Sequence, residues 1–180
     1  DSDDIAVPNR MEMQLTFMAQ HPEIDVLGGQ IEEFIGEPSN VVGKRIVPTS
    51  SNDIKYYLRA RCPMNLQTIL CRKSAVLTVG GFQDWFCEED YYLWIRLILA
   101  GKQMANLGAT LCYVRVGKEM YQRRGGWKYF KSERGIQRYM WQHHLITYPR
   151  YCYNVFIRFL VQVAMPNKMR GWVFRTFARK

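Results

Sequence analysis

The strongest helix signal in the chain lies between Glu88 and Ala100. Three consecutive carboxylates open this segment, at the end where a helix dipole favours negative charge. A mostly apolar stretch follows, and Gly101 then stands where helices commonly end on a left-handed residue. The segment therefore predicts a helix over residues 88–100 with an acidic amino end.

Strands and shorter helices are expected on both sides of this helix. The β-branched residues at 24–34, together with Gly28-Gly29, predict a strand that is bulged at the glycines. Shorter extended segments are expected at 44–47, 66–71, 104–107 and 111–116, with a turn at Gly108. Further helices are expected from Pro8 to about His21, from Ser51 to about Arg61, and over 73–79. This alternation of strands and helices is typical of an α/β fold.

The charge of the chain is divided unevenly. Residues 1–114 hold 10 Lys/Arg and 14 Asp/Glu, a formal charge of −4, whereas residues 115–180 hold 15 and two, a charge of +13. Because the pattern changes near residues 117–126, we expect an α/β part over 1–120 and a helical basic extension over 121–180. Such a cationic extension suggests an anionic partner: phosphate, a membrane surface or nucleic acid.

The extension itself predicts two helices. Residues 127–144 read as one long basic helix, and residues 151–163 as an apolar one that carries Asn154, Arg158 and Gln162. These three are spaced by four, so they form one narrow polar line on the second helix. That helix is too short and too polar for a membrane span, which needs about 18 apolar residues.

The cysteines give little guidance. The five are odd in number and form no C-x-x-C pair, which favours reduced thiols over a zinc site or a disulfide framework.

Carboxylates that are candidates for metal binding or catalysis cluster at two places in the sequence. Asp1 and Asp3 would face one way in an extended chain and could share a divalent cation, although an acidic helix cap is the alternative. At the start of the 88–100 helix, one carboxylate could act as a general base. The alternative there is simple stabilisation of the helix dipole.

Several blocks together resemble family 2 inverting glycosyltransferases of the GT-A fold. The blocks are Asp1-Ser2-Asp3-Asp4-Ile5, Pro8-Asn9-Arg10, Gln14-Leu15, His21-Pro22-Glu23-Ile24-Asp25-Val26-Leu27-Gly28, Arg72-Lys73-Ser74-Ala75-Val76, Val79-Gly80-Gly81-Phe82, Glu89-Asp90-Tyr91, Leu93-Trp94-Ile95-Arg96-Leu97 and Gly101. The resemblance covers residues 1–125 and continues more loosely into the tail, which is similar to bacterial members that build surface polysaccharides. It implies the second half of a GT-A mixed sheet with flanking helices, followed by an α-helical basic tail.

The resemblance also implies roles for individual residues. Asp90 would be the catalytic base with Glu89 in support, and Asp1 and Asp3 would bind Mg²⁺ or Mn²⁺. The implied substrate-binding residues are Asn65, Gln67, Thr68, Trp94, Arg123 and Arg124. Gln67 stands where many relatives have histidine, and because glutamine cannot titrate near pH 7, only hydrogen bonding is expected of it. The Q-x-x-R-W signature of processive synthases is absent, which favours transfer of a single sugar.

The implied partners are a nucleotide-sugar donor and a glycan or lipid-linked acceptor. We expect a cytoplasmic protein, peripheral at the inner face of the plasma membrane if residues 149–180 contact anionic lipid. The alternatives for those residues are docking on the catalytic domain or on another copy in a homo-oligomer. A basic nucleic-acid- or membrane-binding module without catalysis is the second class considered, but no nucleic-acid motif is present, so no nucleic acid is expected. In the family a nucleotide-binding half precedes the D-x-D motif, so the 180 residues alone are expected to be inactive.

Overall fold

A computed structural model describes residues 3–117 and 125–165 of the chain. Asp1, Arg123, Arg124 and residues 166–180, which carry several of the predictions above, lie outside these ranges. Within the described ranges no helix is long and apolar enough to cross a membrane. All five cysteines have free thiols.

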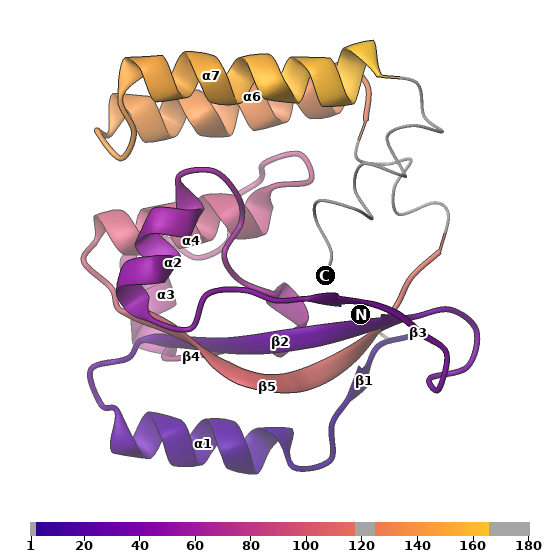
Figure 1. Ribbon diagram of the computed structural model, residues 1–180. Helices are drawn as coiled ribbons and strands as arrows, with labels where there is room; N and C mark the ends of the chain where they lie inside the picture. The colour runs from indigo at the N-terminus through magenta and orange to yellow at the C-terminus, as the bar shows by residue number, and fades with distance from the viewer. Residues whose placement is uncertain (1–2, 118–124, 166–180) are drawn as a thin grey trace.

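The described residues form a five-stranded mixed sheet with helices on both faces (Figure 1). The strands are β1 (Ile5–Ala6), β2 (Val26–Phe34), β3 (Val41–Arg45), β4 (Leu70–Cys71) and β5 (Met104–Arg115). The helices are α1 (Arg10–Gln20), α2 (Ser51–Leu58), α3 (Lys73–Thr78), α4 (Glu89–Leu99), α6 (Trp127–Gln142) and α7 (Tyr148–Phe159), with a 3₁₀ turn at Leu66–Thr68 and a π-helical turn at Leu160–Ala164.

The sheet is centred on β2 and β5, which run parallel. The strand order is β1-β5-β2-β3, and β4 also pairs with β2. Strand β1 is antiparallel to β5, while β3 and β4 are antiparallel to β2. Eight of the nine residues of β2 are buried, as expected for a central strand that is covered on both faces.

The pairing is irregular beside the glycines, but the extra residues lie in the partner strand β5 and not in β2, where the bulge was predicted. Gly29 pairs with Leu107 while the next residue, Gln30, pairs with Thr110, so β5 accommodates two extra residues there. The prediction of two strands with a turn at Gly108 is therefore wrong. Residues 104–115 form one continuous strand, because the pairing with β2 absorbs Gly108 and Ala109 as an irregularity rather than a reversal.

Helices cover the sheet in layers. On one face, Phe17 and Met18 of α1 pack against Leu27 and Ala105. The other face carries α2, α3 and α4, and the hairpin of α6 and α7 lies beyond α4 (Figure 1). Buried residues of α2, α4 and α6 belong to one apolar core, with Trp94 among its largest members.

Other predicted segments also differ from the structure. The extended segment expected at 44–47 is the strand Val41–Arg45. Helix α1 begins at Arg10 rather than Pro8, so the acidic residues before Pro8 do not cap it. The segment 66–71 is largely a 3₁₀ turn instead of a strand. There Asn65 accepts hydrogen bonds at its carbonyl from both the backbone N–H and the hydroxyl of Thr68, at 2.9 and 2.7 Å. These local bonds curl the chain and leave only Leu70–Cys71 extended.

The helix expected over 88–100 is confirmed as α4, Glu89–Leu99. Gly101 has a φ of 74°, the left-handed conformation that ends many helices. The buried guanidinium of Arg96 donates to the carbonyls of Val79 and Gly81, which fixes α4 to the turn after α3.

Candidate active site

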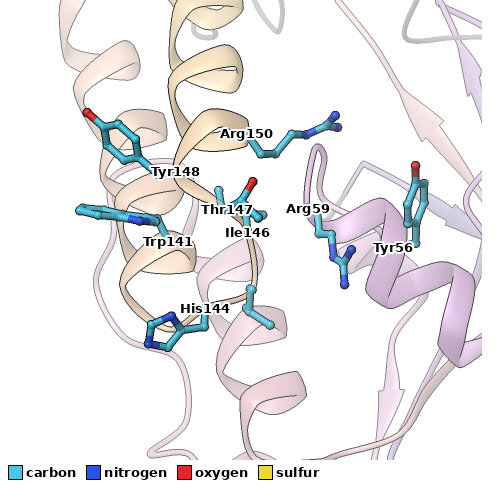
Figure 2. A pocket seen from close by; sticks show the side chains of 9 residues that line it. Tyr56, Arg59, Trp141, His144, Ile146, Thr147, Tyr148 and Arg150 are labelled. Atoms are coloured by element: carbon cyan, nitrogen blue, oxygen red, sulfur yellow. The ribbon is translucent and has the colours of Figure 1, made fainter.

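An open hollow of about 620 Å³ lies where α6 turns into α7, beside α2 (Figure 2). Its wall includes the guanidinium groups of Arg59 and Arg150 and the rings of Trp141 and Tyr148. Such a lining suits an anionic group with an apolar neighbour. Among the residues that the structure describes, none that the sequence predicts as catalytic, substrate-binding or metal-binding lines this hollow.

The predicted catalytic carboxylates lie elsewhere, at the amino end of α4. Asp90 is half-buried and Glu89 is exposed. The thiol of Cys62, in the loop after α2, lies 3.6 Å from the carbonyl oxygen of Met64 and 3.8 Å from Oδ2 of Asp90, and its single proton can go to only one of them at a time. Burial, followed by the charge of Asp90, raises the pKa of this thiol far above its ordinary value. Cys62 is therefore protonated at neutral pH and can donate to the Met64 carbonyl or to the Asp90 carboxylate.

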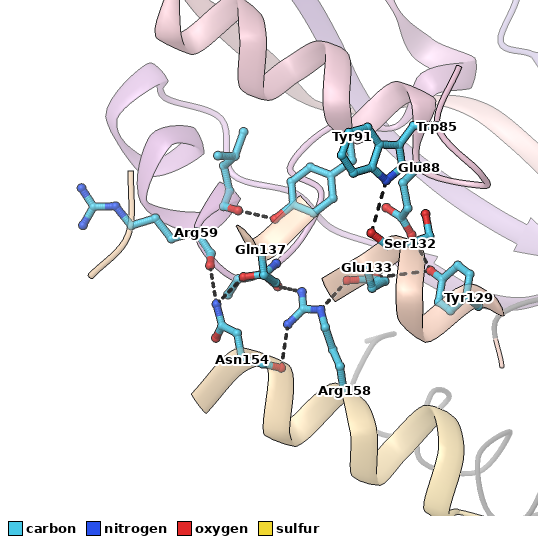
Figure 3. A network of polar contacts seen from close by, with 12 residues as sticks. Arg59, Trp85, Glu88, Tyr91, Tyr129, Ser132, Glu133, Gln137, Asn154 and Arg158 are labelled. Carbon is cyan, nitrogen blue, oxygen red and sulfur yellow. Dashed lines mark hydrogen bonds and ion pairs between the residues drawn. The ribbon is translucent and has the colours of Figure 1, made fainter. Parts of the chain in front are cut away.

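Glu88, the first acid of the same cluster, was not predicted as a site residue. Its side chain is buried, at 5% exposure, and accepts a hydrogen bond of 2.6 Å at Oε1 from the hydroxyl of Tyr129 in α6 (Figure 3). The sequence signal that could have indicated this is a tyrosine on the inner face of the basic helix. Only the fold brings the two residues together, since 41 positions separate them.

The loop before α4 is also held by α6. The indole N–H of Trp85 donates to the carbonyl of Ser132 at 3.2 Å, and the Ser132 hydroxyl donates to the carbonyl of Phe86 at 2.6 Å. Together with the bond between Tyr129 and Glu88, these contacts fix the segment leading into α4. The hairpin of α6 and α7 thus positions the acidic end of α4.

The predicted substrate-binding residues divide by burial. Asn65 and Thr68 are fully buried, and both bind the backbone of Gly29. The Asn65 amide donates to the Gly29 carbonyl at 2.8 Å, and the Gly29 N–H donates to the Thr68 hydroxyl at 3.0 Å. Trp94 is 1% exposed and lies in the core. Gln67, between Asn65 and Thr68, is half-buried. Substrate binding stays a prediction for all four residues. The three buried side chains could contribute to it only by positioning neighbouring residues.

Gln14 is a structural residue whose role the sequence reasoning missed. Its side chain is fully buried under the sheet, and its amide donates to the carbonyls of Thr68 at 2.7 Å and Leu27 at 3.3 Å. Arg10 donates to its amide oxygen at 3.0 Å. The available signal was a polar residue three and four positions before Phe17 and Met18, on the face that a helical period assigns to the core.

Asp4, beside the predicted metal ligands, lies at the end of β5. The backbone N–H of Arg115 donates to Oδ1 of Asp4 at 3.1 Å, and Oδ2 of Asp4 is buried without a partner among the described residues. Asp3 is exposed. These are hard oxygen donors of the kind that Mg²⁺ and Mn²⁺ prefer. The described part of the chain holds no cluster of three His, Cys, Asp or Glu that could complete a metal site.

Polar side chains form a buried seam under α7 (Figure 3). Arg158 pairs with Glu133 of α6 and donates to the carbonyl of Ala60 at 2.7 Å. The Asn154 amide donates to the carbonyl of Arg59 at 2.9 Å and to Gln137 at 2.7 Å. The predicted polar line on this helix is confirmed, and it points inward.

The chain resembles known proteins along its whole length. No family model matches it. Over 180 residues it is 39% identical to a protein of Haemophilus influenzae named as a glycosyltransferase, and covers 66% of it. It is 32% identical, again over 180 residues, to the UDP-Gal:α-D-GlcNAc-diphosphoundecaprenol β-1,3-galactosyltransferase of Escherichia coli, covering 65%. It is 40% identical over 133 residues, 74% of the chain, to the amylovoran biosynthesis glycosyltransferase of Erwinia amylovora, covering 49%.

These relatives support one class of protein. The mixed sheet with flanking helices is consistent with a glycosyltransferase domain, and the homologues of the chain are glycosyltransferases of polysaccharide and O-antigen biosynthesis. The resemblance to glycosyltransferases inferred from the sequence is therefore confirmed at the level of this class. The chain spans about two thirds of the length of the first and second of the relatives described above and half of the third.

Proposed function

We propose that the chain is the acceptor-side part of a family 2-like inverting glycosyltransferase with a GT-A fold, in bacterial surface polysaccharide or lipopolysaccharide synthesis. The observation that carries the proposal is the half-buried Asp90 at the amino end of α4, with the neutral Cys62 thiol beside its carboxylate. The homology to named glycosyltransferases along the whole chain supports it.

In this proposal Asp90 is the general base. An acceptor hydroxyl oxygen attacks the anomeric carbon of a nucleotide-diphospho-sugar, the bond from that carbon to the diphosphate breaks, and Asp90 takes the hydroxyl proton. The helix dipole favours the ionised carboxylate that this step requires. The backbone N–H of Tyr91 donates to Oδ1 of Asp90 at 2.6 Å and, with the Cys62 thiol beside Oδ2, orients the carboxylate. Glu89, the exposed residue directly before Asp90, supports the base by adding negative charge.

The donor diphosphate is proposed to lie near the amino-terminal carboxylates. Asp1 and Asp3 would hold Mg²⁺ or Mn²⁺, which when bound would neutralise charge on the leaving diphosphate. The exposed Asp3 and the unpaired Oδ2 of Asp4 fit such a cation as oxygen donors. We propose that Arg123 and Arg124 contact the diphosphate.

The acceptor is proposed to be a lipid-linked glycan. Relatives of 32% and 31% identity are named for transfer to an α-D-GlcNAc-diphosphoundecaprenol. Gln67 is proposed to hydrogen-bond the acceptor, while Asn65 and Thr68 hold its loop on the bulge at Gly29. Trp94, buried beneath the site, would shape it through packing.

The test is sugar transfer by the natural full-length protein. Nucleotide-diphospho-sugars of different nucleotides would be supplied singly with a lipid-linked GlcNAc-diphosphate acceptor, and the product analysed by mass spectrometry and NMR. We expect addition of one sugar with inverted anomeric configuration, abolished by EDTA and restored by Mg²⁺ or Mn²⁺. Retained configuration, or no transfer from any nucleotide sugar, would overturn the proposal.

The 180 residues alone are proposed to be inactive. The chain spans only about two thirds of the first relative, and donor binding is assigned to the remaining part. Turnover of any sugar nucleotide by these 180 residues would refute that assignment without touching the role of Asp90.

A further inference from the structure

The outer surface of the hairpin carries two rows of exposed side chains. The row on α7 and its continuation is apolar, and consists of Pro149, Cys152, Tyr153, Phe156, Ile157 and Leu160. Phe156 and Tyr153 are 59% and 58% exposed, far more than a helix packed in a core would allow. The row on α6 is basic, and consists of Lys131, Arg134 and Arg138.

Both rows point away from the rest of the protein. On α7, Asn154 binds the domain beneath it, and Phe156 lies two residues further, about 200° around the helix. On α6, the buried Ile136 and Met140 face the core, so the exposed row lies on the opposite side. Figure 1 shows the hairpin as the outermost layer beyond α4. The two rows are therefore neighbours on one surface.

The surface has no negative charge to balance its basic row. Residues 125–165 contain six Lys/Arg and one carboxylate, Glu133, which is buried in its pair with Arg158. The inverted pattern of α7, polar inside and apolar outside, therefore coincides with a cationic face. Large apolar side chains beside Lys and Arg are the composition of helices that lie in the interface of an anionic membrane.

We propose that the α6–α7 outer surface binds an anionic lipid bilayer, with the apolar row entering the interface and the basic row on the head groups. Nucleic acid offers no partner for the apolar row. A two-fold contact with a second copy would bring two cationic surfaces into one interface, which like-charge repulsion disfavours. The inference rests on the proposed function in one respect: a lipid-linked acceptor would lie in the membrane, so binding to the membrane would bring the enzyme to its acceptor.

The experiment is vesicle flotation of the natural full-length protein. Vesicles of phosphatidylcholine alone would be compared with vesicles that also contain phosphatidylglycerol. We expect binding to the anionic vesicles, weakened by salt. The triple variant Lys131→Gln/Arg134→Gln/Arg138→Gln should lower the affinity on the order of a hundredfold, about fivefold for each charge. Phe156→Glu/Leu160→Glu should abolish binding.

The controls place the same changes elsewhere. Leu77→Glu and Lys73→Gln alter exposed residues of α3 and should leave binding unchanged. Circular dichroism checks that every variant folds. The inference would be overturned if the wild-type protein did not bind anionic vesicles, or if the α3 control variants lost as much vesicle affinity as the hairpin variants. So would a dimer in size-exclusion chromatography that Phe156→Glu/Leu160→Glu splits, because the surface would then be a subunit interface.

Failure of this inference can be distinguished from failure of the proposed function. Transfer to a short-chain, water-soluble acceptor analogue should be the same for wild type and for the hairpin variants, because none of the changed residues lies at Asp90. If vesicles bind but no sugar is transferred to any acceptor, the proposed function fails and the membrane surface stands.

Discussion

The hydroxyl of Tyr129 donates a hydrogen bond of 2.6 Å to the buried carboxylate of Glu88, and so joins α6 to the residue that precedes α4. Tyr129→Phe removes this donor while preserving the ring. We expect the free energy of unfolding to fall by about 1–3 kcal/mol, since a buried carboxylate loses a hydrogen bond. Urea denaturation measures this. The matched control, Tyr153→Phe on the exposed face of α7, should change stability by less than about 0.5 kcal/mol.

The pair of Arg158 and Glu133 is expected to be costly to break from one side. Arg158→Met leaves the Glu133 carboxylate, which is only 12% exposed, without its partner cation. We expect a loss of about 3–5 kcal/mol. The double variant Arg158→Met/Glu133→Gln should recover part of that loss, because no buried charge remains. A double variant that loses the full sum of the two single variants would show that the two side chains are not coupled.

The bulge in the sheet requires glycine at position 29. A Cβ at Gly29 would lie 2.5 Å from a methyl carbon of Leu111, which is itself fully buried. Gly29→Ala should therefore destabilise the protein by about 1–3 kcal/mol through overpacking. Gly108→Ala, across the same irregularity, meets nothing within 4 Å. Thermal unfolding of the two variants should differ clearly, and equal effects would contradict this packing.

Stability is expected to fall above about pH 9 because of Cys62. Burial raises the pKa of its thiol above the ordinary value of 9.0, and the charge of Asp90 adds to the effect. Below pH 9 both the folded and unfolded states hold the proton. Above it the unfolded chain loses the proton that the folded chain retains, so stability declines by about 1.4 kcal/mol per pH unit.

Cys62→Ser isolates this contribution, because serine does not titrate in that range. Between about pH 8 and about pH 10 its stability should decline less steeply than that of the wild type. Burial also raises the pKa of Tyr91 well above 10.0, so a further decline shared by both proteins is expected above pH 10. Parallel curves for the two proteins in urea titrations would contradict the role of Cys62.

The sequence predicted those parts of the fold that local chemistry determines. The helix over 88–100 and its end at Gly101 follow from charge, apolar spacing and a left-handed glycine. The strand Val26–Phe34 follows from the β-branched run at 24–34. In each case residues close together in the sequence determine the element, so the sequence alone was enough to predict it.

Tertiary contacts determined the features that the sequence did not predict. Continuous pairing with β2 joins residues 104–115 into one strand despite Gly108. The inward direction of the polar line on α7 depends on carbonyls at Arg59 and Ala60, about 95 positions away. The burial of Asn65 and Thr68 comes from Gly29, which the local sequence could not indicate.

The most direct test of the central proposal is the transfer rate of the natural full-length protein with Asp90→Asn, compared with Glu89→Gln. Asparagine keeps the shape and removes the proton acceptor, so kcat should fall by about 10²–10⁴-fold with little change in the KM for donor. Glu89→Gln, on the exposed neighbour, should lose less than about tenfold. An Asp90→Asn protein that keeps wild-type kcat would contradict the account.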